Sequence, residues 1–274
     1  MIPDFHGKKI TKIPELNIEE YSELTNVKIS LRTTISLNNL RKGILSPLVG
    51  FNSYEDTMEI MKESRLPGGV PWSIPLLLPV ENETFQNILD GDMISLNYNS
   101  KVKAILSVEE KFSIDRNKYC QKIYGTDDKL HPGVESMMKQ DNSYLSGKIL
   151  GISSDQEFSE FSQVDPIELR KMFKARNFKS VTAFQTRNPP HRGHEFLHKF
   201  ALLTTDALLL NPVIGPKKPG DFSDNEIFES YKIYVDNYLP QKRVFLYPLI
   251  YTMHYAGPRE ALMHMIMRKN LGCS

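Results

Sequence analysis

The chain has 274 residues, 40% hydrophobic and 24% charged, a composition typical of a globular protein large enough for two modest domains. Its 34 Lys and Arg residues balance 33 Asp and Glu, so the net charge of +1 favours neither nucleic acid nor a membrane as partner. Two distant cysteines, Cys120 and Cys273, suggest neither a disulfide framework nor a zinc site. The start, MIPDFHGKKI, lacks the apolar core of a signal peptide, so we expect a cytoplasmic protein.

The first half of the chain contains short apolar, β-type runs separated by Gly, Pro and Asn. One helix is predicted over residues 53–65. Small and polar residues dominate from Ser153 to Asp165, where we place the boundary between a domain over residues 1–160 and a second over 161–274. The runs that predict a mostly β first domain are KISL, WSIPLLLPV, DMISLNY, VKAILSVEEKF and GKILGI.

The second half alternates between predicted helices and strands. Strands separated by amphipathic helices are typical of an α/β domain with a parallel sheet. The predicted helices cover residues 166–176, 194–203, 225–239 and 258–270, and the predicted strands cover 180–184, 207–214 and 243–250.

A polar cluster follows the first of these strands. The carboxyl ends of the strands are where open α/β sheets bind their ligands. Two prolines follow the cluster, and they make the connection to the next helix short and stiff. The cluster consists of Gln185, Thr186, Arg187 and Asn188.

The next helix begins with the sequence HRGH. His191 and His194 fall on one face, beside the backbone amides of a helix N-terminus, and with Arg187 they would form a phosphate site. Gly193 would let a ligand approach, although it could equally be a plain turn glycine. The histidines could also simply cap the helix or pack against it.

Other catalytic motifs are missing from the sequence. It contains no GxSxG, HExxH, GxxxxGK[ST] or GxGxxG. Nucleotidyl transfer needs positive charge and hydrogen-bond donors around phosphates rather than an enzyme nucleophile, and this polar cluster provides both. Lys217, Lys218 and Asp221 follow the second strand, and Arg259 follows the third. These four could help to bind a ligand, or they could be solvated turn residues, with Arg259 paired to a carboxylate.

The runs AFQTRNPPHRGHE, KPGD and YAGPREALMHMIMRKNLGCS resemble the ATP sulfurylase (sulfate adenylyltransferase) family in order and spacing. The first half is similar to the same family at FHGKKI, at the long run from GILSPLVGF to LLLPV, and at YGTDDKLHPGVESM. Nearly the whole chain is covered by the resemblance.

The resemblance implies a PUA-like β domain followed by an α/β nucleotidyltransferase domain of the HxGH type. It also implies conversion of ATP and sulfate to adenosine 5′-phosphosulfate and pyrophosphate, by in-line attack of sulfate on the α-phosphorus. Magnesium would arrive with ATP, with no tightly bound cofactor and no protein metal site. By position, Gln185 and Arg187 would bind sulfate; Thr186, Arg187 and Asn188 would stabilise the α-phosphate; all four, with His191 and His194, would contact ATP.

Two features depart from the family pattern. The family motif continues into a strand that ends in GRDHA, whereas this sequence stops at Ser274, so the strand before Arg187 is expected to be an exposed edge. We therefore expect a homo-oligomer, or a second chain that supplies the missing strand. His254 stands where many relatives are expected to have Arg, which puts an anion-binding role there in doubt.

Alternatives to an active enzyme remain open. The chain could be a non-catalytic relative that still binds nucleotide. It could bind RNA through its PUA-like half, although the near-neutral charge argues against this. It could also be another adenylyl- or cytidylyltransferase, but QTRN before HRGH and AGPREA after it argue against that reading.

Overall fold

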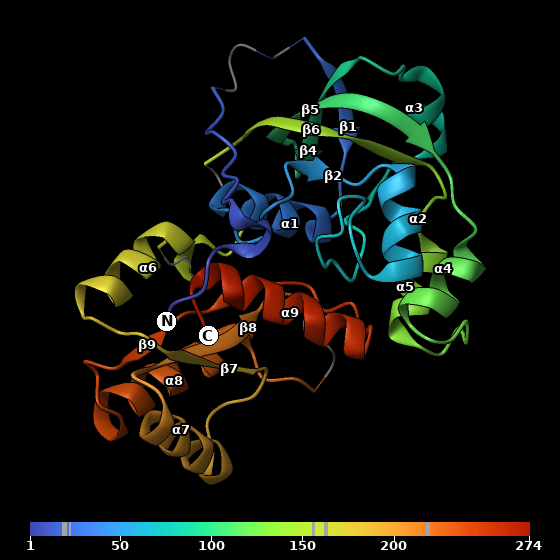
Figure 1. Ribbon diagram of the computed structural model, residues 1–274. Helices are drawn as coiled ribbons and strands as arrows, with labels where there is room; N and C mark the ends of the chain where they lie inside the picture. The colour runs from blue at the N-terminus through green and yellow to red at the C-terminus, as the bar shows by residue number, and fades with distance from the viewer. Residues whose placement is uncertain (18–20, 22, 155–156, 162–163, 218–219) are drawn as a thin grey trace. The chain divides into compact units, whose positions relative to one another are not determined.

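The computed structural model describes residues 1–17, 21, 23–154, 157–161, 164–217 and 220–274 (Figure 1). The chain forms two compact units. The six-stranded unit comprises Lys9–Gln156 and Met253–Met267. The parallel-sheet unit comprises Met1–Lys8, Glu157–Thr252 and Arg268–Ser274. One boundary between the units lies between residues 156 and 157, and another falls within the last helix, α9, Pro258–Leu271, whose final turn belongs to the parallel-sheet unit.

The six-stranded unit is built on a mixed sheet in the order β1-β4-β5-β6-β2, with β3 also paired to β6. Only the β1–β4 pair is parallel among the strands described, and the remaining pairs are antiparallel. The strands are β1 Thr25–Lys28, β2 Gly50–Phe51, β3 Leu78–Pro79, β4 Met93–Tyr98, β5 Lys101–Phe112 and β6 Tyr144–Ile152.

The prediction of a mostly β first domain is wrong, because this unit also carries a substantial set of helices. KISL combines the end of β1, the N-cap and the first residue of a helix: the Ser30 side chain accepts a hydrogen bond from the Thr33 amide. WSIPLLLPV contributes only β3, since proline cannot donate to a sheet. The helices are α1 Leu31–Lys42, α2 Tyr54–Glu63, α3 Asn82–Asn87, α4 Arg116–Ile123 and α5 Pro132–Lys139.

The parallel-sheet unit shows the predicted alternation of strands and helices. Strand β8 lies in the middle, with β7 on one side and β9 and β10 on the other, and every pair is parallel. The predicted strand over 243–250 is split into β9 and β10 around Tyr247 and Pro248. The elements are α6 Pro166–Ala175, β7 Val181–Thr186, α7 Arg192–Thr204, β8 Ala207–Ile214, α8 Asp224–Tyr238, β9 Val244–Leu246 and β10 Leu249–Ile250.

The core of this unit surrounds β8, which is buried along its whole length. Helices α7 and α8 pack on one face of the sheet, and on α6 Phe173 packs edge-on against Phe245 of β9, with ring centroids 4.9 Å apart. The cluster under α7 and α8 consists of Leu202, Leu208, Leu210, Ile227, Tyr231, Tyr234, Val235, Leu239 and Val244.

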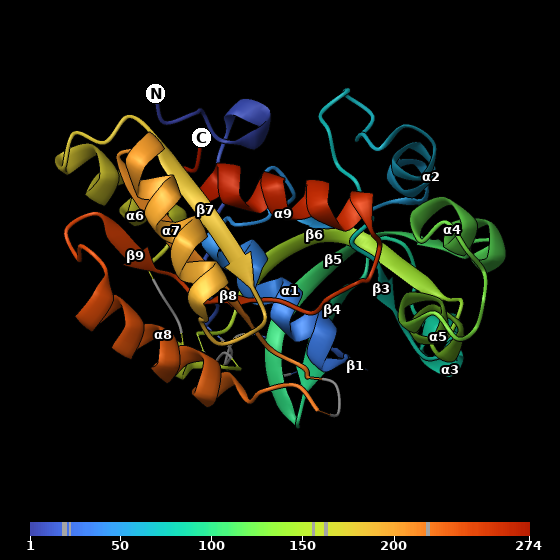
Figure 2. The same ribbon diagram turned by 90° about the horizontal axis from the view of Figure 1, so that it is seen from below.

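Strand β7, by contrast, is an edge of the described sheet, and only Val181 in it is fully buried. Ser274 lies at the start of this edge, where its amide donates to the Val181 carbonyl (3.0 Å) and its hydroxyl accepts from the Val181 amide (3.1 Å). Helix α7, which runs beside β7 (Figure 2), has an exposed apolar stripe. The residues of this α7 stripe are Phe196, Leu197, Phe200 and Leu203.

Residues near the two ends of the described chain meet around Arg170 of α6. Its guanidinium donates to the carbonyls of Pro3 (2.7 Å), Lys269 (2.6 Å) and Asn270 (2.8 Å), and it stacks over Phe5. These contacts anchor the N-terminal segment and the end of α9 within one unit. Among the residues that the structure describes, none of the helices is long and apolar enough to cross a bilayer.

Candidate functional site

The predicted polar cluster lies at the carboxyl end of the edge strand β7. Strand β7 extends two residues further than predicted, so Gln185 and Thr186 are its last residues and pair in register with Asn211 and Pro212 of β8. Arg187 then follows directly in the connection to α7. This is the edge at which parallel α/β sheets bind ligands.

Asp221 brings a carboxylate to this edge. Asp221 Oδ2 accepts a hydrogen bond of 2.5 Å from an Arg187 terminal nitrogen, and each side chain is about 30% exposed. Lys217 points elsewhere, because its ammonium group pairs with Asp224 at 2.8 Å. Lys218 lies outside the described residues. Since the Arg187–Asp221 pair is partly open to solvent, a dianion could compete with Asp221 for the guanidinium.

Gln185 is held by a residue that the sequence analysis missed. A terminal nitrogen of Arg268, in the last turn of α9, donates to the Gln185 side-chain oxygen. Burial lowers the pKa of Arg268. The contact orients the Gln185 amide group so that its NH2 remains a donor. Gln185 and Arg268 are 83 residues apart, so nothing in the local sequence pattern could have indicated the pair.

The turn after β7 is fixed by Thr186. The Asn188 amide donates to the Thr186 hydroxyl oxygen at 3.1 Å, which makes a tight polar turn in front of the two prolines. Asn188 itself is exposed. Its side chain is therefore accessible to a ligand at the strand end.

His191 is the N-cap of α7. Its Nδ1 accepts hydrogen bonds from the amides of Gly193 (3.1 Å) and His194 (3.4 Å), because its extended backbone turns the ring over the helix start. In this conformation the two amides are therefore occupied by the His191 ring. With Nδ1 acting as acceptor, the proton of a neutral ring lies on Nε2, which can donate to a ligand.

His194 stacks on His191, with ring centroids 3.7 Å apart, and meets Phe184 edge-on. Burial, and then the nearby His191, lowers the pKa of His194. One turn further on, His198 is fully buried, with Nδ1 3.2 Å from the Tyr234 hydroxyl. Burial lowers the pKa of His198 to about 4. His194 and His198 are thus neutral near pH 7.

An open hollow of about 600 Å³ lies beside the start of α7. Pockets of this size accommodate drug-sized ligands. It lies between α7 and α8 and is lined by Pro190, His191, Arg192, Glu195, Ser230, Ile233, Tyr234 and Tyr238.

Arg259 has a structural role in the six-stranded unit. Its guanidinium donates to the carbonyls of Ile60 (2.8 Å) and Met61 (2.9 Å) at the end of α2, and to that of Ser73 (3.1 Å). The proposed carboxylate partner is therefore replaced by carbonyl groups, which suit a cation at a helix C-terminus. Its position after the third predicted strand had suggested that Arg259 could help to bind a ligand.

Comparisons with known proteins cover both units. The ATP-sulfurylase family model matches residues 162–274, and the PUA-like domain model matches residues 11–154. The sulfate adenylyltransferase of Staphylothermus marinus is 39% identical over 280 residues, which cover all of this chain and 73% of the relative. This chain belongs to the sulfate adenylyltransferase family. The family expected from the sequence is confirmed.

A second relative supports this family assignment, and one solved structure has a similar fold. The enzyme of Hyperthermus butylicus is 41% identical, over 93% of this chain and 66% of the relative. A solved structure described as a hexameric APS kinase from Thiobacillus denitrificans has a TM-score of 0.78 at 20% identity, which shows the α/β fold alone. All of this chain matches it, but only 52% of that chain is covered.

Proposed function

We propose that this chain is a nucleotidyltransferase that converts Mg-ATP and sulfate to adenosine 5′-phosphosulfate and pyrophosphate, the first step of sulfate activation. Family membership supports the reaction. The observation that carries the site is the placement of Arg187 at the carboxyl end of β7, followed by the HRGH start of α7. This strand, turn and helix form an HxGH nucleotidyltransferase site, preceded by a PUA-like domain, with the boundary near residue 160.

The reaction needs no group from the enzyme as nucleophile. A sulfate oxygen forms a bond to the α-phosphorus while the bond from that phosphorus to the bridging oxygen of pyrophosphate breaks, and pyrophosphate leaves with the electron pair. Sulfate is a dianion at neutral pH, so no proton has to be removed from it. The protein must instead bring two anions together and offset their repulsion.

The residues at the strand end divide this work. Gln185 and Arg187 bind sulfate, and Arg187 extends its charge to the α-phosphate, which Thr186 and Asn188 also contact. The planar guanidinium of Arg187 suits a tetrahedral dianion such as sulfate, and sulfate binding displaces Asp221 from it.

The HRGH helix start holds the phosphate chain of ATP. His191 donates from Nε2, and His194 contacts the same phosphates as a neutral group. Magnesium arrives bound to ATP, offsets charge on the phosphates and stays partly hydrated. Among the described residues, no group of three or more His, Cys, Asp or Glu is placed to hold a metal ion.

A second candidate is a nucleotide-binding protein without turnover. It is favoured by one observation: Arg187 already binds Asp221, so this contact would have to be exchanged for sulfate. The two candidates differ in sulfate-dependent release of pyrophosphate from Mg-ATP. The non-catalytic candidate predicts ATP binding without that release.

The test is a pyrophosphate-release assay on the protein and on Arg187→Ala. We expect turnover in the protein and a fall of about 10²–10³-fold in the variant, the usual cost of removing one group that stabilises developing charge. Arg65→Ala is a matched control, because Arg65 is exposed and its guanidinium donates to the Gly69 carbonyl of its own turn. A normal rate in Arg187→Ala would refute the site, and ATP binding without turnover would favour the second candidate.

We further propose that this cytoplasmic protein associates with another polypeptide, either a second copy or a chain that adds a strand beside β7. The position of β7 at the edge of the described sheet and the α7 stripe support this, since such surfaces drive association. Phe200, on the stripe, is 57% exposed. Phe200→Lys should weaken any self-association seen by analytical ultracentrifugation, and an unchanged mass distribution would count against this surface.

A further inference from the structure

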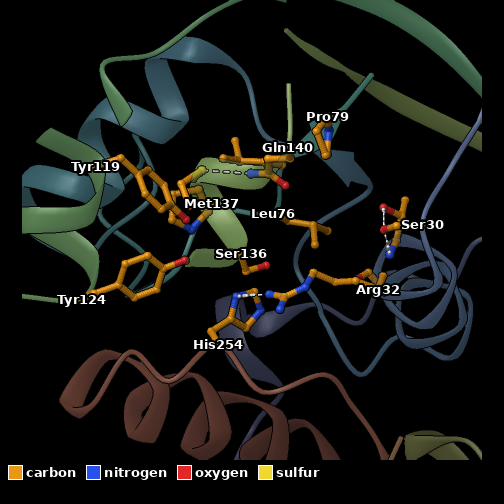
Figure 3. A pocket seen from close by; sticks show the side chains of 14 residues that line it. Ser30, Arg32, Leu76, Pro79, Tyr119, Tyr124, Ser136, Met137, Gln140 and His254 are labelled. Carbon is orange, nitrogen blue, oxygen red and sulfur yellow. Dashed lines mark hydrogen bonds between the residues drawn. The ribbon is translucent and has the colours of Figure 1, made fainter. Parts of the chain in front are cut away.

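The six-stranded unit contains a small polar cavity of about 60 Å³ (Figure 3). Its walls come from α1, α4, α5, the segment before β3 and the loop before α9. This volume is far below the roughly 300 Å³ at which pockets for drug-sized ligands begin, so a nucleotide does not fit. The polar groups in its wall include Arg32, Tyr119, Tyr124, Ser136, Gln140 and His254.

The Arg32 guanidinium has few protein partners. One terminal nitrogen lies 3.1 Å from His254 Nδ1, and the other is 3.5 Å from the Met253 carbonyl, at the limit of a hydrogen bond. Within the described part of the chain, the Arg32 guanidinium makes no other hydrogen bond or ion pair. A guanidinium carries five N–H groups, so Arg32 has donors to spare at the cavity wall.

His254 does not neutralise this cation. Arginine can only donate, so His254 Nδ1 must accept and the ring is the neutral Nε2–H form. Burial, and then the charge of Arg32, lowers the pKa of His254 and keeps the ring neutral. This His254 is the residue where the sequence comparison expected Arg.

The nearby acidic group is already engaged. Glu260 accepts hydrogen bonds from the amides of His254 (2.6 Å) and Ala256 (3.3 Å), one with each carboxylate oxygen. It thereby fixes the loop that carries His254. The carboxylate does not form an ion pair with Arg32 among the described residues, so the positive charge at the cavity is not cancelled by direct contact.

The remaining polar wall groups are mostly hydroxyls that can donate. Figure 3 shows the hydroxyls of Tyr124 and Ser136 near the Arg32 guanidinium and the His254 ring. Burial raises the pKa of Tyr124 and of Tyr119, so both phenols keep their protons. The cavity therefore combines one cation with several neutral donors.

We propose that this cavity binds one small tetrahedral oxyanion of the sulfate or phosphate type, at a site separate from the residues around Arg187. Four acceptor oxygens match the surplus donors of Arg32 and the hydroxyls of Tyr124 and Ser136. An anion there ties α1 and α5 to the loop that precedes α9.

The test uses the full chain in an Arg187→Ala background, which removes the main contact of the proposed catalytic sulfate site. Sodium sulfate, sodium phosphate and sodium chloride are titrated at equal ionic strength. The readouts are the midpoint of thermal unfolding and the NMR shift of the Arg32 Nε–Hε group. Sulfate or phosphate should raise the midpoint and move the Arg32 resonance in a saturable way, and chloride should do neither.

Two variants test the cavity itself. Arg32→Gln should raise the sulfate or phosphate concentration at half-maximal response at least tenfold. Ser136→Leu, which fills the cavity, should abolish the response. Arg65→Gln, an exposed arginine of the same unit, should keep the full response. An unchanged response in both cavity variants, no movement of the Arg32 resonance, or an equal effect of chloride would overturn the proposal. Because catalysis is not measured, these outcomes are independent of the proposed enzyme activity.

Discussion

Helices α5 and α7 begin with the same device, 60 positions apart in the chain: HPGVESMMK from His131 and HRGHEFLHK from His191. In each, Nδ1 of the leading histidine accepts from the amides two and three residues later, at 3.2 and 3.4 Å in α5 and at 3.1 and 3.4 Å in α7. Each helix also has a Glu–Lys pair in its first turns, Glu135–Lys139 and Glu195–Lys199.

The surroundings of the two helix starts differ. In α5 the His131 ring packs against Tyr124 at 5.4 Å, and Val134 is fully buried. In α7 the capping residue His191 is exposed and stacks on a second histidine, His194, in the place of that valine. The His-x-Gly sequence therefore specifies a helix start. Solvent exposure of the α7 start makes it, and not the α5 start, a candidate ligand site.

The largest expected effect comes from exchanging each capping histidine for asparagine, which caps a helix equally well but has no imidazole. His191→Asn should lower kcat/KM for sulfate-dependent pyrophosphate release by about 10²-fold, because a donor to the phosphates is lost. His131→Asn should leave it within about twofold of the unchanged protein. Equal losses in both variants, measured on folded protein, would mean that His191 is only a cap.

Replacing the glycine of each helix start with alanine should cost more stability at α5, where Gly133 is closely packed, than at α7, where Gly193 is open. A Cβ on Gly133 would lie 2.6 Å from the His254 carbonyl oxygen, so Gly133→Ala should cost about 3 kcal/mol of stability. A Cβ on Gly193 would meet only the movable His191 ring, at 3.0 Å, so Gly193→Ala should stay within about 1 kcal/mol. Urea unfolding measures both, and similar losses would contradict the contrast.

Helix α7, with its N-cap, carries the three histidines His191, His194 and His198, so acid should destabilise it more than α5. The pKa of His198 is lowered to about 4, against about 6.5 when unfolded, so the unfolded chain binds the extra proton as the pH falls. This histidine should therefore remove about 2 kcal/mol of stability between pH 7 and pH 5. His198→Met, which copies Met138 of α5, should flatten that slope in urea unfolding, and an unchanged slope would exclude His198 as its source.

The smallest effect is expected where the two helices are alike. Lys139→Ala and Lys199→Ala each remove an exposed Glu–Lys pair one turn apart, so each should cost about 0.3–0.5 kcal/mol. The loss should shrink in 1 M salt. A loss above about 1 kcal/mol for Lys199 alone would show that its pair does more in α7 than in α5.

Much of the parallel-sheet unit could be predicted from the sequence, because its helices have a clear period and its strands are mostly apolar. Strand β8 matches its predicted limits, and Arg187 lies at the strand end as expected. The six-stranded unit was harder. KISL has the letters of a strand, and only the Ser30 cap marks the start of α1.

The contacts around the candidate site could not be predicted, because they depend on side-chain directions and on distant segments. Arg268 reaches Gln185 from the last turn of α9, and Asp221 reaches Arg187 from a loop. The occupied amides of the α7 start depend on the rotation of the His191 ring over its own helix. A sequence period describes faces of helices and strands, and it contains no information on such contacts.

The contacts of Arg170 with both ends of the described chain affect the order in which the protein can fold during synthesis. The parallel-sheet unit needs both Pro3 and Asn270, which is synthesised after all of the strands described above. During synthesis the six-stranded sheet can form early, since all of its strands precede residue 153. The N-terminal segment must meanwhile wait, unpaired, until α9 emerges. A nascent chain arrested before α9 would thus carry a folded first sheet and an unfinished second unit, the form that chaperones are most apt to retain.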